Sequence, residues 1–160
     1  MTIRIGMGFD AHSFEEGLPL ILGGVEIPFH KGLAGHSDGD ALVHSVMDAL
    51  LGAAGLGNKG TYFPSTDEHL RNVSSLNLLA NVGTLITSNG WRIVNLDTTI
   101  LAQQPYLAPY TNQMQEKIGE VLSIRLDTMS VKPTTTDYLG SIGKNEGIAA
   151  YAVALIEALQ

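Results

Sequence analysis

The stretch TIRIGMGFDAH at residues 2–12 decides the fold expected for this chain. Its apolar side chains alternate with small or polar residues up to Phe9, which is the two-residue period of a β-strand. Side chains two residues apart in a strand point to the same face, so Asp10 and His12 can converge on one ion if the strand continues that far. The stretch therefore predicts a strand that ends in two metal-ligand types.

A third candidate ligand, His44, falls on the next predicted helix. Two histidines and one carboxylate leave a fourth position on zinc open, as in catalytic zinc sites. Asp40, His44 and Asp48 are spaced to share one helix face, so either carboxylate is predicted to hold the second ring nitrogen of His44. Spacing alone leaves an alternative in which Asp10 caps a turn, Asp40 caps the helix and the histidines lie on the surface.

The remaining elements follow from hydrophobic periodicity and from breaker residues. The His44 helix should start near Ser37 or Asp38 and end at Gly55 or Gly57. Further helices are predicted over 74–88 and 109–122, and strands or extended segments over 20–27, 91–101 and 128–132. Residues 148–159 fit a buried helix or a central strand equally. We expect residues 1–160 to form a single domain that mixes helices and strands.

Composition excludes several classes of function. The formal net charge is −7, from 16 acidic and 9 basic side chains without a Lys/Arg cluster, so nucleic-acid binding is not expected. No membrane span and no leader are predicted, which favours a cytoplasmic protein, although a processed plastid protein would look the same. With 44% hydrophobic and only 16% charged residues, the chain mildly favours an oligomer.

A second candidate site is the loop sequence KPTTTD at residues 132–137. Its hydroxyls and backbone N–H groups can surround a phosphate, and Asp137 can reach a cation bound to that phosphate. The alternative is an ordinary strand end, with Asp137 as a turn or cap residue. His36 is a candidate donor to a substrate oxygen, with a solvated surface histidine as its alternative.

Several separate stretches together match one known pattern. They are residues 8–12 (GFDAH), 22–25 (LGGV), 34–40 (AGHSDGD), 48–53 (DALLGA), 134–136 (TTT) and 146–149 (EGIA). In this order and spacing, the chain resembles the 2-C-methyl-D-erythritol 2,4-cyclodiphosphate synthase family over essentially its whole length. The resemblance favours the metal-binding interpretation of Asp10, His12 and His44.

The resemblance implies an α+β fold, with a mixed β-sheet and helices packed on one face, in a homotrimer with active sites at the subunit interfaces. It implies Zn²⁺, or another divalent transition metal, at Asp10, His12 and His44, and Mg²⁺ or Mn²⁺ bridging substrate phosphates near Asp137. His36 and Thr135 match the positions that stabilise the transition state. The implied reaction cyclises 4-diphosphocytidyl-2-C-methyl-D-erythritol 2-phosphate with release of CMP. Segment 101–107 and the threonines would hold the cytidine diphosphate part from the neighbouring subunit, and the C-terminal segment would be a strand.

The substrate-binding positions implied by the resemblance are numerous, and some depart from the family pattern. They are Asp10, His12, His36, Ser37, Asn58, Gly60, Phe63, Ser65, Asp67, Ala102, Pro105, Tyr106, Leu107, Thr134, Thr135, Thr136, Asp137, Ser141 and Lys144. The departures are Asn58 and Ser65 for Asp, Tyr106 for Lys, Lys144 for Arg, Asp137 for Glu and Ser141 for Phe. Fewer cationic side chains are therefore expected beside the phosphates, and substrate affinity should be altered.

Two other functions fit the same residues. One is a degenerate homologue that binds cytidine nucleotide and metal with little turnover. The other is a zinc-dependent phosphohydrolase that uses metal-bound water as its nucleophile. The family often has a hydrophobic channel on its three-fold axis that can hold an isoprenoid diphosphate, and the sequence does not test this feature.

Overall fold

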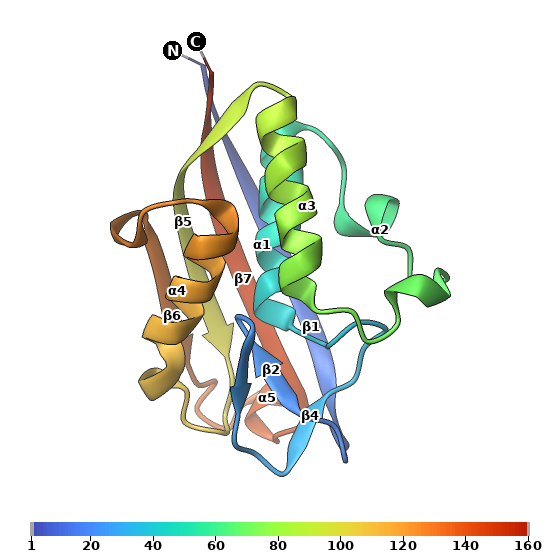
Figure 1. Ribbon diagram of the computed structural model, residues 1–160. Helices are drawn as coiled ribbons and strands as arrows, with labels where there is room; N and C mark the ends of the chain where they lie inside the picture. Colours follow the sequence, from blue (N-terminus) through green and yellow to red (C-terminus); the bar gives the residue numbers. More distant parts are fainter. Residues whose placement is uncertain (1, 160) are drawn as a thin grey trace.

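The computed structural model describes residues 2–159, and a mixed five-stranded sheet organises them (Figure 1). The strand order is β4-β1-β7-β5-β6, and only β5 and β6 run parallel. The strands are β1 (Ile3–Glu16), β4 (Lys31–Leu33), β5 (Trp91–Leu101), β6 (Met129–Thr134) and β7 (Gly147–Ala158). A separate antiparallel pair joins β2 (Leu20–Leu22) to β3 (Val25–Ile27).

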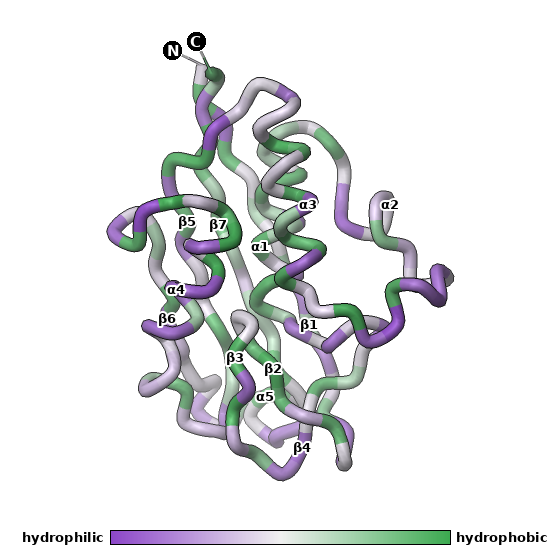
Figure 2. Tube along the Cα trace, in the orientation of Figure 1, coloured by the Kyte–Doolittle hydropathy of each residue, from purple (hydrophilic) through white to green (hydrophobic). Residues whose placement is uncertain are grey.

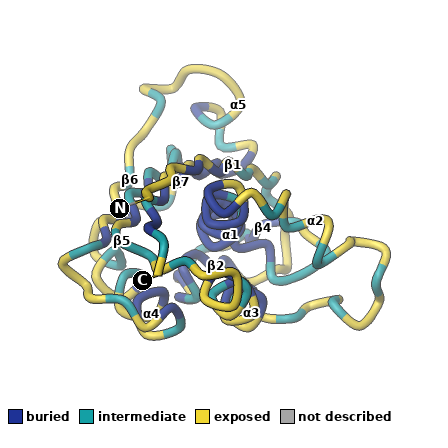
Figure 3. The backbone as a smooth tube through the Cα atoms, turned by 90° about the horizontal axis from the view of Figure 1, so that it is seen from above, coloured by how far each residue is buried: buried dark blue, intermediate teal, exposed yellow. Residues whose placement is uncertain are grey.

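The three long helices cover one face of this sheet, as the view from above shows (Figure 3). They are α1 (Ala41–Ala54), α3 (Ser75–Ser88) and α4 (Thr111–Leu122); the short helices are α2 (Lys59–Tyr62) and α5 (Gly140–Gly143), with 3-10 turns at Glu68–Leu70, Ala108–Tyr110 and Leu126–Thr128. The short α5 lies beyond the opposite face (Figure 3). The segment between α2 and α3 is rich in hydrophilic residues (Figure 2). Within residues 2–159, no helix combines the length and the apolar character that crossing a membrane requires.

Two glycines of β1 allow α1 to pack directly on the strand. A Cβ atom at Gly6 would lie 2.1 Å from the carbonyl oxygen of Ala49, and one at Gly8 would lie 1.9 Å from that of Ser45. The backbones of helix and strand are therefore in contact, and α1 is buried almost all round. This close approach brings the His44 turn of α1 against the middle of β1.

The structure confirms most predicted elements and moves some of their ends. Strand β1 continues seven residues past Phe9, paired with β7 as far as Ser13, so Asp10 and His12 share one strand face. The C-terminal segment is the strand β7, as the resemblance implied. Strand β6 runs on to Thr134, which shortens the expected phosphate loop. The third helix starts at Thr111, after a 3-10 turn that contains Pro109.

The predicted start of the His44 helix is wrong by about one turn because Asp40 is its N-cap. The buried Asp40 carboxylate accepts hydrogen bonds from the backbone N–H groups of Val43 (3.0 Å), Gly23 (2.9 Å) and Gly24 (2.7 Å). It thereby joins the helix start to the β2–β3 turn. Its oxygens are fully used there, so the predicted contact with the His44 ring is also wrong, and the helix-cap alternative is confirmed.

Candidate active site

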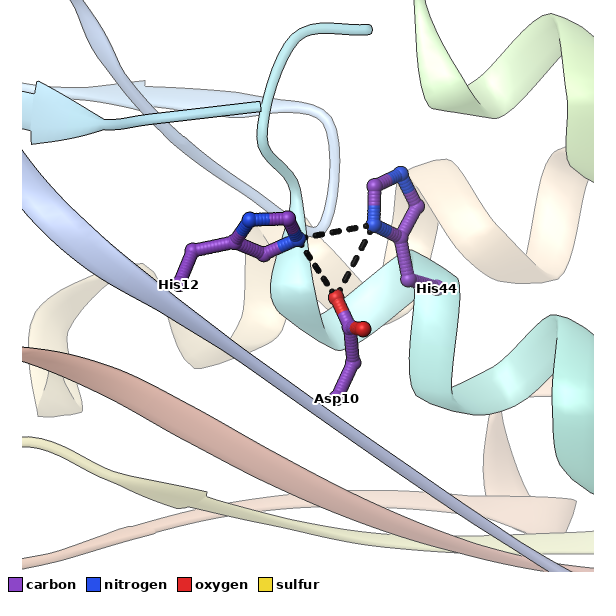
Figure 4. Close-up of side chains that lie close together, drawn as sticks. All are labelled: Asp10, His12 and His44. Carbon is purple, nitrogen blue, oxygen red and sulfur yellow. Dashed lines mark hydrogen bonds and ion pairs between the residues drawn. The ribbon is translucent and has the colours of Figure 1, made fainter. Parts of the chain in front are cut away.

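The side chains of Asp10, His12 and His44 converge beside the second half of β1 (Figure 4). Asp10 Oδ2 lies 2.6 Å from His12 Nε2 and 2.9 Å from His44 Nδ1, and the two ring nitrogens are 3.2 Å apart. His44 is buried, while Asp10 and His12 are partly buried. The alternative of two surface histidines is therefore wrong.

The hydrogen-bond network fixes which nitrogen of His12 faces the centre. His12 Nδ1 lies 2.6 Å from the carbonyl oxygen of Ala34, which can only accept, so Nδ1 carries the hydrogen. In the neutral ring, Nε2 then presents a lone pair to Asp10. The strand–loop contact thus prepares His12 to act as a metal ligand through Nε2.

A longer chain of hydrogen bonds orients His44. Ser75 Oγ lies 2.5 Å from Asp38 Oδ1 and 2.8 Å from His44 Nε2. Because the carboxylate accepts, the Ser75 hydroxyl donates to it and must in turn accept from His44 Nε2–H. His44 Nδ1 is then left with a lone pair that points at Asp10 Oδ2.

Three acceptor atoms therefore face one another without a donor between them. Burial raises the pKa of Asp10, but the contacts with His12, His44 and the Lys59 ammonium hold that pKa well below its usual range. Burial lowers the pKa of His12, but the Asp10 carboxylate raises that pKa on balance. A dication at the centre of the three atoms would satisfy all three acceptors.

The types of ligand atom suit zinc, and the distances between these atoms are close to those of a zinc site. Zinc takes His nitrogen and carboxylate oxygen at about 2.0–2.2 Å, which for a tetrahedral site places the ligand atoms about 3.3 Å apart. The three pairs here are 2.6–3.2 Å apart, so a small outward movement would admit the ion. The residues can thus hold a metal and leave a fourth position open.

Asp48, the second helix carboxylate predicted to hold the His44 ring, does not do so. Like Asp40, it has other partners. Its Oδ1 accepts from the backbone N–H of Lys59 at 2.7 Å, and its Oδ2 lies 3.3 Å from Lys59 Nζ. The residues that the sequence reasoning missed are Ser75, Asp38 and Lys59. They come from three different segments, and no spacing in the sequence links them to the ligand set.

A cavity of about 460 Å³ opens over the ligands. The predicted site residues that line it are His12, His36, Ser37, His44, Asn58, Gly60, Phe63 and Ser65. His36 Nε2 lies 2.7 Å from the carbonyl oxygen of Asp67 and donates to it, which holds the imidazole at the cavity edge. The Asn58 side chain caps α2 by accepting from Thr61 N–H.

Of the other predicted residues, Asp10 belongs to the ligand set and Asp67 contacts His36, whereas the rest lie away from the first cavity. A second cavity of about 760 Å³ is lined by Phe29, residues 102–108, Pro133, Thr134 and Thr135. Within the described part of the chain, no residue lines both cavities. Thr136, Asp137, Ser141 and Lys144 line neither cavity, and the Asp137 carboxylate accepts a hydrogen bond from the nearby Thr135 hydroxyl at 3.3 Å. Within one chain, the predicted site residues that line a cavity therefore fall into two separate groups.

The Ser75 hydroxyl gives a direct test of the His44 orientation. Ser75→Ala is expected to weaken Zn²⁺ binding at least about tenfold, because the group that fixes the ring of a ligating histidine is lost. The affinity would be measured by competition with a chromophoric chelator, and the His44 tautomer by ¹⁵N NMR. Ser37→Ala is the matched control, since Ser37 Oγ lies 3.1 Å from the same nitrogen without a carboxylate behind it. Equal effects of the two substitutions would contradict the Asp38–Ser75–His44 chain.

Comparison with known proteins decides the family. The model of the YgbB family matches residues 3–157. This chain belongs to the YgbB family. A family member from Pelotomaculum thermopropionicum, 2-C-methyl-D-erythritol 2,4-cyclodiphosphate synthase, is 53% identical over 154 residues, which cover 96% of this chain and 95% of that protein.

Solved structures of other proteins share the fold. The structure of IspF from Plasmodium falciparum in complex with CDP has a TM-score of 0.86 at 34% identity, covering 99% of this chain and 97% of that one. The bifunctional IspDF from Campylobacter jejuni has a TM-score of 0.96 at 40% identity. The match covers 99% of this chain but only 43% of that longer protein.

Proposed function

We propose that this chain is a 2-C-methyl-D-erythritol 2,4-cyclodiphosphate synthase of non-mevalonate isoprenoid biosynthesis. It converts 4-diphosphocytidyl-2-C-methyl-D-erythritol 2-phosphate to the cyclic 2,4-diphosphate and CMP, as a phosphorus–oxygen lyase. The observation that carries the proposal is the three-acceptor site of Asp10, His12 and His44, in a chain about half identical to named synthases over nearly its full length. These features favour a synthase over a degenerate homologue or a phosphohydrolase. We place the reaction in the cytoplasm, as the sequence predicts.

The metal roles follow the donor chemistry. Asp10, His12 and His44 would hold Zn²⁺, and Asp137 would contribute to a Mg²⁺ or Mn²⁺ site on the substrate phosphates. When bound, the zinc ion supplies Lewis-acid polarisation of a phosphate oxygen. The Ala34 carbonyl and the Ser75 hydroxyl keep both histidines in the tautomers that this role needs.

The chemistry needs positioning more than a protein nucleophile. An oxygen of the 2-phosphate forms a bond to the β-phosphorus, the bond from that phosphorus to the CMP oxygen breaks, and CMP leaves. Both reacting groups belong to one molecule, so a cavity that folds the substrate can contribute about 7 kcal/mol or more through proximity. His36 and Thr135 would donate to the oxygens that gain negative charge.

We also propose a homotrimer with the substrate between subunits. The first argument is that the two halves of the site line different cavities of one chain. The second is the sheet face opposite α1, where apolar side chains of β1 and β7 are exposed. They are Ile3, Ile5, Met7, Phe9, Tyr151 and Val153. The register places Met7 beside Val153 and Phe9 beside Tyr151, so they form one apolar patch of the kind that an oligomer buries.

In this trimer the second cavity would hold the cytidine diphosphate part of the substrate. Its lining by Ala102, Pro105, Tyr106 and Leu107 presents backbone groups and apolar surface, which suit a base and ribose. The CDP complex of the Plasmodium falciparum neighbour supports a cytidine nucleotide. A channel on the three-fold axis for an isoprenoid diphosphate would accompany the same assembly.

The proposed function is tested by incubating the protein with 4-diphosphocytidyl-2-C-methyl-D-erythritol 2-phosphate and Mg²⁺, followed by ³¹P NMR. We expect equal amounts of CMP and cyclic diphosphate, and no product after a chelator has removed the metals. Release of inorganic phosphate would instead identify a phosphohydrolase. Unchanged substrate with folded, metal-loaded protein would identify a binding-only homologue. Light scattering during size-exclusion chromatography tests the trimer in the same preparation.

Tyr106 offers a prediction for the cytidine half of the site. Its side chain is 79% exposed at the second cavity, where the resemblance implies a lysine beside the diphosphate. Tyr106→Lys is expected to raise kcat/KM several-fold, because a cation would attract the substrate phosphates. Thr84→Lys on the exposed side of α3, which does not line this cavity, controls for a general gain of charge. An unchanged kcat/KM for Tyr106→Lys would mean that the lost lysine does not limit this enzyme.

A further inference from the structure

Lys59, the first residue of α2, reaches across to the proposed metal site. Its Nζ lies 2.9 Å from Asp10 Oδ1 and 3.3 Å from Asp48 Oδ2, and its backbone N–H is held by Asp48 Oδ1. The side chain is largely buried and links β1, α1 and α2. Among the described residues that line the first cavity, Lys59 is the only lysine or arginine.

This contact makes the two oxygens of Asp10 different. Oδ2 faces the acceptor nitrogens of His12 and His44, while Oδ1 accepts from the Lys59 ammonium. A carboxylate can bind a metal through one oxygen or through both. The ammonium group takes one lone pair of Oδ1 and repels a dication that approaches this oxygen. Oδ2 is therefore the oxygen that binds a metal more readily.

We propose that Lys59 sets the metal selectivity of the site by restricting Asp10 to one-oxygen coordination. Zinc accepts four ligands of the His and carboxylate type, and the triad with one open position supplies such a set. Ions such as Mn²⁺ favour more oxygen ligands in a larger coordination shell, and a two-oxygen carboxylate suits them better. Lys59 therefore favours Zn²⁺ over Mn²⁺. This inference rests on the metal site proposed above, but not on the reaction.

The positive charge of Lys59 has a separate effect that must be removed from the measurement. It repels every dication by the same Coulomb energy, because that energy depends on charge and distance and not on the element. The ratio of the Mn²⁺ and Zn²⁺ dissociation constants cancels this general effect. The ratio then reports the effect of how many oxygens Asp10 offers to the metal.

The test compares the wild-type protein with Lys59→Met, which keeps an apolar stem and removes the donor and the charge. Dissociation constants for Zn²⁺ and Mn²⁺ would be measured by chelator competition without substrate. We expect Kd(Mn²⁺)/Kd(Zn²⁺) to fall about tenfold, the lower end of the usual effect of groups behind a metal ligand. We also expect the visible absorption of the Co²⁺ form to weaken, as it does when a four-coordinate ion gains a fifth ligand.

Two controls make the result specific. Lys59→Arg keeps the charge and a donor for Oδ1, so the ratio should stay near that of the wild type. Asp48→Asn removes the charge beside Lys59 but keeps an acceptor for the Lys59 N–H, so it should shift both affinities together and leave the ratio unchanged. If Lys59→Met does not fold by circular dichroism, Lys59→Leu, which also lacks a donor and a charge, is measured in its place with the same expectation.

Each outcome decides between the inferences. A wild-type ratio and a wild-type Co²⁺ spectrum in folded Lys59→Met would overturn the role of Lys59 and leave the metal site standing. A wild-type protein that binds neither Zn²⁺ nor Mn²⁺ at the triad would overturn both. Because no substrate is present, the result is independent of whether the protein makes the cyclic diphosphate.

Discussion

His44→Ala is expected to abolish tight Zn²⁺ binding and to lower the synthase activity at least about 10³-fold. Two ligands remain after this change, and the Asp10 carboxylate keeps Lys59 and His12 as partners that neutralise it. Loss of the Lewis acid removes several kcal/mol of transition-state stabilisation, and each 1.36 kcal/mol is about a factor of ten in rate. Metal content after dialysis and the rate of CMP release at matched protein concentration measure the two effects.

His69→Ala is the matched control for that experiment. His69 is exposed in the segment between α2 and α3, and only its backbone N–H bonds to Asp67. It should bind metal and turn over like the wild type. Full activity of metal-free His44→Ala would refute a catalytic role for the metal.

Gly8→Ala is expected to destabilise the protein by at least about 3 kcal/mol, at the upper end of overpacking costs. The added Cβ would lie 1.9 Å from the Ser45 carbonyl oxygen and 2.7 Å from the Ala49 nitrogen. Both are backbone atoms, so a rotamer change cannot relieve the contact and α1 must move away from β1. The melting temperature should fall by roughly 6 °C or more, since about 2–4 °C is lost per kcal/mol at this chain length.

Because α1 carries His44 and β1 carries Asp10, the same substitution should weaken Zn²⁺ binding although no ligand is changed. The control is Gly52→Ala on α1, where an added Cβ meets nothing within 4 Å. Alanine in an open helix position should stabilise the protein by about 0.5–1 kcal/mol and leave metal binding intact. Thermal unfolding of the metal-free variants and chelator competition measure both properties. A Gly8→Ala protein as stable as the wild type would contradict the close backbone packing.

The sequence by itself determined the elements and the kinds of ligand. Alternation in residues 2–9 and apolar periodicity near His44 are local signals, because a strand face and a helix stripe each repeat within one segment. They located β1 and α1, and the residues Asp10, His12 and His44 provided the metal chemistry. The family resemblance added that the C-terminal segment is a strand, which periodicity left open.

Only the tertiary structure decided how these residues are held. Asp40 turned out to cap α1 instead of supporting His44, because its oxygens meet N–H groups of a turn seventeen residues away. Ser75 and Lys59 became partners of the site through contacts that span 31 and 49 positions. The resemblance implied that segment 101–107 and the threonines act from a neighbouring subunit, and the fold places them at a cavity separate from the ligand set. The physical reason is that hydrogen-bond partners and cavities depend on which distant segments pack together, whereas periodicity records only which side of one segment is buried.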